Sequence, residues 1–256
     1  MKKVFSVSLV ALLVLVSGVI VGAGAEKTVA PGDSLQEAIN SASAGDTILL
    51  EPGTYKVNLS VGVPVTLTSE GARAETILEP EDPSKDIVTV QAGEDEPAIE
   101  NVTIKNLTFQ NGDKSGIVLT GSNHKVIGNI VKNIANHGII PIGGEKVVIS
   151  NNTVENCKKT GIFVWGTAKT VITGNVLDNN KVAVELTEGA TGARIHFNNI
   201  VNSWVFAVRT GKPTVDATLN WWGEGADPAE WVSGDVMVDP SLDGPYPDGA
   251  PTFLEN

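Results

Sequence analysis

The sequence predicts an all-β fold in which a single chain winds into a parallel β-helix, or solenoid. The first observation is a motif containing asparagine that recurs between residues 102 and 223. The second is that each repeat consists of short apolar runs bounded by glycine and asparagine, a pattern typical of β-strands. The third is the 23-residue period, which is typical of solenoids. Successive coils would then pair as parallel strands about 4.8 Å apart.

Two columns of asparagine mark the repeat. The leading asparagines are Asn129, Asn152, Asn175 and Asn198, and the trailing asparagines are Asn133, Asn156, Asn179 and Asn202. Asparagine tolerates the left-handed backbone conformation, so it can turn the chain between two strands. When it is stacked from coil to coil, its amide can also hydrogen-bond to its neighbours. We therefore expect both columns to be structural rather than ligand-binding.

Residues 34–45 predict an amphipathic helix that covers the first open end of the solenoid. Ser34 and Glu37 have the spacing of a capping box, Leu35 and Ile39 fall on one face, and Gly45 ends the segment. The predicted organisation is a signal peptide (1–25), an N-terminal cap helix with the first strands (26–60), the β-helix coils (61–223), and a C-terminal cap and tail (224–256).

The N-terminus has the features of a secretory signal peptide. Lys2 and Lys3 precede an apolar run and the small residues Ala23-Gly24-Ala25. We therefore expect a secreted protein, either extracellular or on the cell surface, that meets a membrane only through this segment if it is uncleaved. The formal net charge of −12 argues against nucleic acid or an anionic membrane surface as a partner.

Two stretches resemble known β-helix proteins. The segment from Ser34 through Ile48 to Pro52-Gly-Thr-Tyr55 resembles the N-terminal part of right-handed parallel β-helix proteins in the pectin-lyase-like superfamily. Asn220-Trp-Trp-Gly223 followed by Asp227-Pro228 resembles the terminating segment of secreted bacterial and archaeal β-helix proteins, including NosD-like and cell-surface types. The resemblance implies right-handed coils, but it leaves the activity open, because that superfamily includes lyases, hydrolases, esterases, epimerases and non-enzymatic surface proteins.

The sequence predicts no catalytic residue, no metal site and no cofactor. His124, His137 and His196 fall in three different columns of the repeat, so they are not expected to form a metal cluster. Asn136-His137-Gly138 is only distantly similar to the Gly-His-Gly of polygalacturonases, and the carboxylate pair that glycoside hydrolysis needs is missing beside it. Two alternatives remain open. One is a polysaccharide lyase or hydrolase acting on polyuronates, and the other is the copper processing that the NosD-like resemblance implies.

One outward-facing row of residues is the predicted ligand site. If Ile162 and Val164 face the core, Phe163 and Trp165 must face outward. The residues expected to bind a ligand are Ile140, Ile142, Phe163, Trp165, Glu185 and Arg209. An apolar patch rimmed by polar groups is typical of a surface that binds a sugar or a protein partner. The equally weighted alternative is that a loop or the C-terminal segment covers the patch.

A second outward row contains Lys158, Lys181 and Trp204, and we expect it to be a solvated edge. The sequence therefore favours a non-enzymatic protein that binds a polysaccharide or a cell-envelope component through the Phe163 row.

Overall fold

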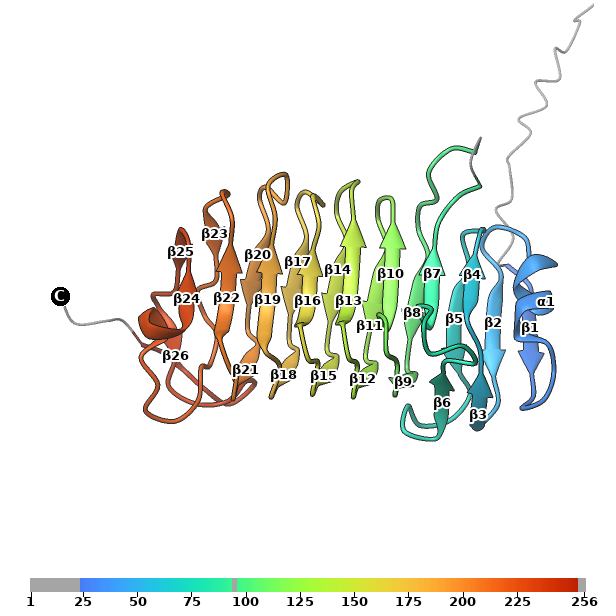
Figure 1. The fold of residues 1–256 in the computed structure, drawn as a ribbon, viewed down its shortest axis with the longest axis horizontal. Helices are drawn as coiled ribbons and strands as arrows, with labels where there is room; N and C mark the ends of the chain where they lie inside the picture. The colour runs from blue at the N-terminus through green and yellow to red at the C-terminus, as the bar shows by residue number, and fades with distance from the viewer. Residues whose placement is uncertain (1–23, 94–95, 253–256) are drawn as a thin grey trace, which may run out of the picture.

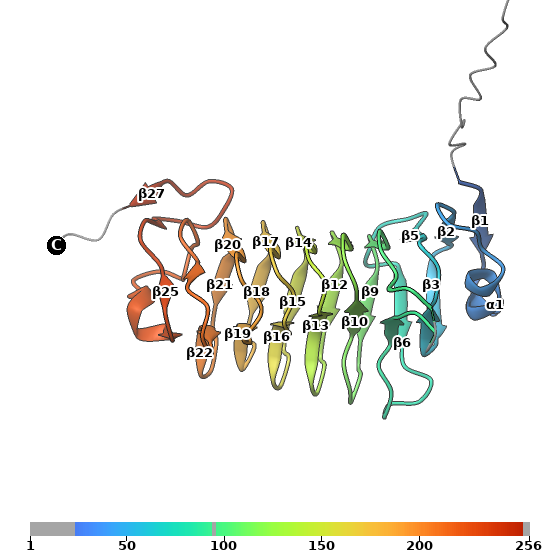
Figure 2. The ribbon, with the colours of Figure 1, turned by 90° about the horizontal axis from the view of Figure 1, so that it is seen from above.

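The chain forms a right-handed parallel β-helix in a computed structural model, which confirms the predicted fold class (Figure 1). The structure describes residues 24–93 and 96–252, so most of the predicted signal peptide lies outside the described residues. Three parallel sheets run side by side along the molecule (Figures 1 and 2). Within the described ranges, no helix has the length and apolar character needed to cross a membrane.

Each complete coil contributes one strand to each sheet. Sheet A contains β1 (Glu26–Val29), β2 (Thr47–Leu50), β5 (Thr66–Ser69), β8 (Thr103–Lys105), β11 (Lys125–Ile127), β14 (Val148–Ser150), β17 (Val171–Thr173), β20 (Arg194–His196), β23 (Val215–Asp216) and β25 (Val236–Met237). Sheet B contains β3 (Gly53–Lys56), β6 (Thr76–Glu79), β9 (Thr108–Gln110), β12 (Ile130–Lys132), β15 (Thr153–Glu155), β18 (Val176–Asp178) and β21 (Asn199–Val201). Sheet C contains β4 (Leu59–Val61), β7 (Val88–Val90), β10 (Ile117–Thr120), β13 (His137–Ile142), β16 (Thr160–Val164), β19 (Val182–Leu186), β22 (Phe206–Thr210) and β24 (Val232–Ser233).

The register places residues that are one period apart side by side, as the repeat predicts. Ile149 pairs with Ile172 in sheet A, and Val154 pairs with Leu177 in sheet B. These four side chains are fully buried, and burying each one stabilises the fold by about 1.5–3 kcal/mol. Gly116, Gly138, Gly161, Ala183 and Ala207 form a column of small residues along the repeat. At Gly138 a Cβ would lie 2.6 Å from the carbonyl oxygen of Gly161 in the next coil, so this column lets adjacent coils approach.

The predicted cap helix is α1 (Leu35–Asn40), which lies beside β1 at the N-terminal end (Figure 1). The Ser34 hydroxyl accepts a hydrogen bond from the backbone N–H of Glu37, and Leu35 and Ile39 are buried in the core. The helix ends at Asn40 rather than at Gly45, because the backbone N–H of Ser41 closes the last turn. Strand β1, which the sequence pattern did not predict, extends sheet A by pairing with β2.

The other end of the molecule continues the coil beyond the last asparagine repeat. β24 pairs with β22, and β25 pairs with β23, so partial windings follow Gly223. The 3-10 helix η1 (Pro228–Trp231) and an antiparallel pair, β26 (Ser241–Leu242) with β27 (Pro251–Thr252), complete this end.

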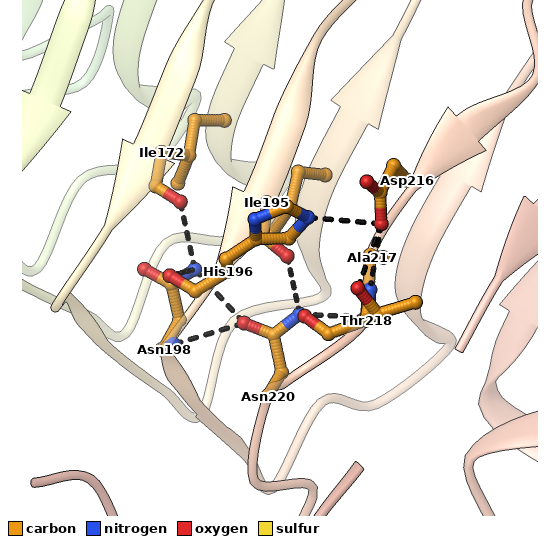
Figure 3. A network of polar contacts seen from close by, with 8 residues as sticks. All are labelled: Ile172, Ile195, His196, Asn198, Asp216, Ala217, Thr218 and Asn220. Carbon is orange, nitrogen blue, oxygen red and sulfur yellow. Dashed lines mark hydrogen bonds and ion pairs between the residues drawn. The ribbon is translucent and has the colours of Figure 1, made fainter. Parts of the chain in front are cut away.

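The leading asparagines form a buried ladder at the corner between sheets A and B. Nδ2 of Asn152 donates to Oδ1 of Asn175 at 3.0 Å and to the carbonyl oxygen of Val126 at 2.9 Å. The same Oδ1 of Asn175 accepts the backbone N–H of Asn152 at 2.9 Å. Figure 3 shows the last rung, where Asn198 donates to Asn220 at 2.9 Å and the side chain of Asn220 donates to backbone carbonyls.

The trailing asparagines have the other predicted role and turn the chain between sheets B and C. The φ angles of Asn111, Asn133, Asn156, Asn179 and Asn202 lie between 53° and 63°. Their side chains are exposed or partly exposed, whereas the leading asparagines are buried. The two explanations that the sequence offers for asparagine therefore apply to different columns.

Replacing Asn175 with alanine should lower the free energy of unfolding by about 3 kcal/mol or more. The substitution leaves the backbone N–H of Asn152 and the carbonyl of Ile149 unpaired inside the protein, and each such loss costs about 1–3 kcal/mol. Asn133→Gly is the matched control, because glycine also adopts the left-handed conformation, and it should cost less than about 1 kcal/mol. Urea unfolding measures both, and equal effects would contradict the assignment of roles.

Candidate functional site

The predicted ligand residues lie together on the outer face of sheet C. Phe163 pairs with Glu185, and Glu185 pairs with Arg209, so these three side chains form one row across β16, β19 and β22. Trp165, directly after β16, forms a parallel bridge with Ile142 at the end of β13. We call the six residues Ile140, Ile142, Phe163, Trp165, Glu185 and Arg209 the aromatic face.

Alternation along β16 exposes the two aromatic rings, as predicted. Ile162 and Val164 are fully buried, whereas Trp165 is 56% exposed and Phe163 is partly exposed. The ring centroids of Phe163 and Trp165 lie 6.2 Å apart. Ile140 is only 8% exposed, so it supports the rings more than it presents a surface of its own. With more than half of Trp165 exposed, no described loop or C-terminal segment covers this ring.

A groove of about 260 Å³ adjoins Phe163, and we call it the Phe163 groove. It is lined by His137, Lys159, Thr160, Phe163, Lys181, Val182, Glu185, Val205 and Arg209. The His137 ring stacks on Phe163 with a centroid distance of 4.7 Å and an interplanar angle of 18°. His137 is therefore a site residue that the sequence analysis did not assign to the aromatic face.

The environment of His137 favours its neutral form. Burial, with a smaller contribution from the charge of Lys159, lowers the pKa of its imidazole from the usual 6.5 to about 4, and Glu185 opposes this shift. Its Nδ1 is buried without a hydrogen-bond partner among the described residues. At neutral pH this ring is therefore uncharged, and it binds a proton only at a pH well below 7.

Charged groups on the groove differ in whether they are paired. The Arg209 guanidinium forms a salt bridge with the Glu185 carboxylate, which also accepts a hydrogen bond from the Thr160 hydroxyl at 3.0 Å. Lys159 and Lys181 are exposed, and neither forms a salt bridge with a described residue. The groove therefore presents two free positive charges beside a neutralised carboxylate.

A larger hollow of about 430 Å³ lies at the C-terminal end of the β-helix, lined in part by Trp221, Trp222 and Trp231. Trp222 is 7% exposed and belongs to the hydrophobic core, as expected for a side chain that closes the open end. Glu224 is the sole charged side chain among the residues that line this hollow. These features fit an end cap.

The side chains that could bind a metal are separated from one another, and two of the three histidines have polar partners of their own. Nδ1 of His124 accepts the backbone N–H of Val102 at 3.2 Å, and Nε2 of His196 lies 2.9 Å from Oδ1 of Asp216 (Figure 3). Burial raises the pKa of the Cys157 thiol to about 12, so it is not a thiolate at neutral pH. Nowhere in residues 24–93 and 96–252 do three or more His, Cys, Asp or Glu side chains gather closely enough to hold a metal.

Comparisons with known proteins identify a family and a fold. A family model described as periplasmic copper-binding protein (NosD) matches residues 85–225. A search of curated protein sequences gives no match. Among solved structures, pectate lyase Pel9A matches with a TM-score of 0.53 and 15% identity, covering 86% of this chain and 79% of its own. Alginate lyase from Paenibacillus sp. str. FPU-7 matches with a TM-score of 0.50 and 15% identity, covering 82% of this chain and 98% of its own. At such identity the likeness shows the fold alone.

The free energy of unfolding should fall as the pH is lowered through the range between about 6.5 and 4. The folded state keeps His137 neutral, whereas the unfolded chain binds a proton below about pH 6.5, so stability is lost as the pH falls. His124 changes the stability in the same direction as the pH falls, because burial also lowers its pKa. The variant His137→Gln should lose less stability between pH 7 and pH 5 than the parent in urea unfolding. An identical pH dependence in both proteins would contradict this description of His137.

Proposed function

The chain belongs to the NosD family, and from that premise we propose that it is an exported, non-enzymatic β-helix protein that binds carbohydrate through the aromatic face. The observation that carries the proposal is Trp165, a large aromatic side chain that is 56% exposed beside Phe163 on a rigid sheet. Aromatic rings with a polar rim provide apolar contact for the C–H face of a sugar ring and hydrogen bonds for its hydroxyls.

The polar rim of the aromatic face suits sugar hydroxyls. The Glu185 carboxylate and the Arg209 guanidinium hold each other in a fixed orientation, and both line the Phe163 groove beside the rings. Phe163, Glu185 and Arg209 lie on β16, β19 and β22, which strand pairing holds in place relative to one another. Little side-chain freedom is therefore lost when a ligand binds. A polysaccharide of the cell envelope is the partner that this arrangement favours.

Two independent features support export. The family model is described as periplasmic, and the N-terminal residues have the composition of a secretory signal. We therefore propose that the protein works outside the cytoplasm, in contact with cell-envelope or extracellular polysaccharide.

The copper binding in the family description does not extend to this proposal, because the residues present do not fit a copper site. The three histidines lie in different coils or on different sheets, and Cys157 is buried as a thiol. Met237 is exposed on β25, and no histidine or cysteine belongs to that strand.

A second candidate function, polysaccharide lyase, is favoured by His137. Its neutral imidazole lines the Phe163 groove together with Lys159 and Lys181. In a β-elimination the His137 imidazole would take the proton from the carbon next to a uronate carboxylate. The electrons of that C–H bond would form a C=C bond as the glycosidic oxygen leaves with its bonding pair. The departing oxygen is then protonated. The two cations would stabilise the charge that develops on the carboxylate.

Trp165→Ala should weaken glycan binding at least about tenfold while leaving the melting temperature nearly unchanged, because the ring is exposed. A glycan array identifies the ligand, and isothermal titration calorimetry measures the affinity. Trp231→Ala, which removes another partly exposed tryptophan far along the chain, is the control and should bind normally. A large loss of thermal stability in Trp165→Ala would place the ring in the core and defeat the proposal.

Turnover separates the two candidate functions. Incubation with polygalacturonate or alginate should release neither unsaturated nor reducing ends if the protein only binds. Release of unsaturated ends that His137→Gln abolishes, with binding retained, would instead establish the lyase. The measurement is ultraviolet absorbance of the products over time.

A further inference from the structure

A second groove lies beside the Phe163 groove, and two of its lining residues, Lys158 and Trp204, belong to the row that was expected to form a solvated edge. This groove, which we call the Trp204 groove, has a volume of about 410 Å³. It is lined by Asn111, Gly112, Asp113, Asn133, Ala135, Asn156, Lys158 and Trp204. It follows the trailing asparagine column, at the corner where sheet B passes to sheet C.

Trp204 is held as an exposed aromatic platform. Its side chain is 52% exposed, and its indole N–H donates a hydrogen bond to Oδ1 of Asn179. Asn179 in turn donates from Nδ2 to Oδ1 of Asn156 at 2.7 Å. The ring is therefore tied to the asparagine column, although half of its surface is open to solvent.

The boundary between the two grooves, which we call the ridge, falls between consecutive residues of the chain. Lys158 lines the Trp204 groove and its chain neighbour Lys159 lines the Phe163 groove. In a later coil, Trp204 lines the Trp204 groove and its chain neighbour Val205 lines the Phe163 groove. Since consecutive Cα atoms are about 3.8 Å apart, a ligand can cross from one groove to the other over the width of a residue.

Unpaired positive charge collects on this ridge. Lys158, Lys159 and Lys181 are all exposed, and none of them forms a salt bridge with another residue of the described chain. Asp113 is the sole carboxylate that lines the Trp204 groove, and Glu185 in the neighbouring groove is already paired with Arg209. In a protein with a formal net charge of −12, such a local excess of cations favours an anionic ligand.

We propose that the ligand is an acidic polysaccharide chain that occupies both grooves at once, a step that rests on the proposed carbohydrate-binding function. Phe163 with Trp165 forms one aromatic platform, and Trp204 forms the second. Lys158, Lys159 and Lys181 bind carboxylates of sugar units between the platforms. The exposed amides of the asparagine column bind hydroxyls along the Trp204 groove.

This arrangement makes binding depend on chain length. A short oligosaccharide reaches only one groove, whereas a longer chain engages both, and the second contact then forms at a high effective concentration. The affinity for a long acidic oligomer should therefore exceed the affinity for a short one by at least about tenfold. A neutral oligomer of the same length loses the lysine contacts and binds more weakly.

The test is isothermal titration calorimetry of the secreted chain with digalacturonate, decagalacturonate and a neutral cello-oligosaccharide. Trp204→Ala should weaken decagalacturonate binding at least about tenfold and leave digalacturonate binding unchanged. Trp165→Ala should weaken both. Trp204→Phe, which keeps an aromatic ring without the indole N–H, should recover most of the lost affinity, and circular dichroism melting checks that each variant is folded.

The role of the lysine charges is tested with a double variant that combines Lys158→Gln and Lys181→Gln. Lys105→Gln on sheet A is the matched control. The double variant should lose affinity for decagalacturonate and become less sensitive to salt, while the control stays unchanged. The inference is overturned if decagalacturonate binds no tighter than digalacturonate, if Trp204→Ala binds normally, or if the neutral oligomer binds equally well. In those cases the aromatic face can still bind sugar. The proposed function fails separately if Trp165→Ala leaves every glycan affinity unchanged, or if no glycan binds at all.

Discussion

Each coil of the β-helix must turn sharply from sheet A to sheet B, and the turn leaves backbone groups inside the protein without strand partners. The leading asparagines satisfy those groups. Their side chains accept a backbone N–H and donate to a backbone carbonyl and to the next asparagine side chain in neighbouring coils, at 2.8–3.1 Å for the rungs from Asn129 to Asn175. Because an unpaired buried polar group is costly, this ladder fixes the register of one coil on the next.

The register then determines which side chains meet on the surface. Phe163, Glu185 and Arg209 come from different coils, and only the stacking of those coils makes them neighbours. The aromatic face and the ridge of lysines are therefore built by the repeat itself, with no dedicated loop or insertion. Such a surface is rigid and elongated, and it can bind a polymer without a change in the fold.

The repeat made the strands, the inward column and the outward position of Phe163 and Trp165 predictable, because each follows from the period and from strand alternation. It could not separate the buried Asn152 from the partly exposed Asn156, since both are the same residue type at adjacent corners. His137 was missed as a neighbour of Phe163 because the two are not in the same column; the stacked rings meet only in three dimensions. The Trp204 groove could not be predicted either, because it depends on the three-dimensional shape of the corner that carries the trailing asparagines.

The central claim is that coil stacking creates one continuous sugar-binding surface on sheet C and its corner with sheet B. Hydroxyl-radical footprinting of the protein with and without polygalacturonate tests it most directly. The account predicts protection of Phe163, Trp165 and Trp204 together, while Phe197 and Tyr246, which contact each other elsewhere on the surface, stay unprotected. Protection of Phe197 and Tyr246 with none at Phe163 and Trp165 would contradict it.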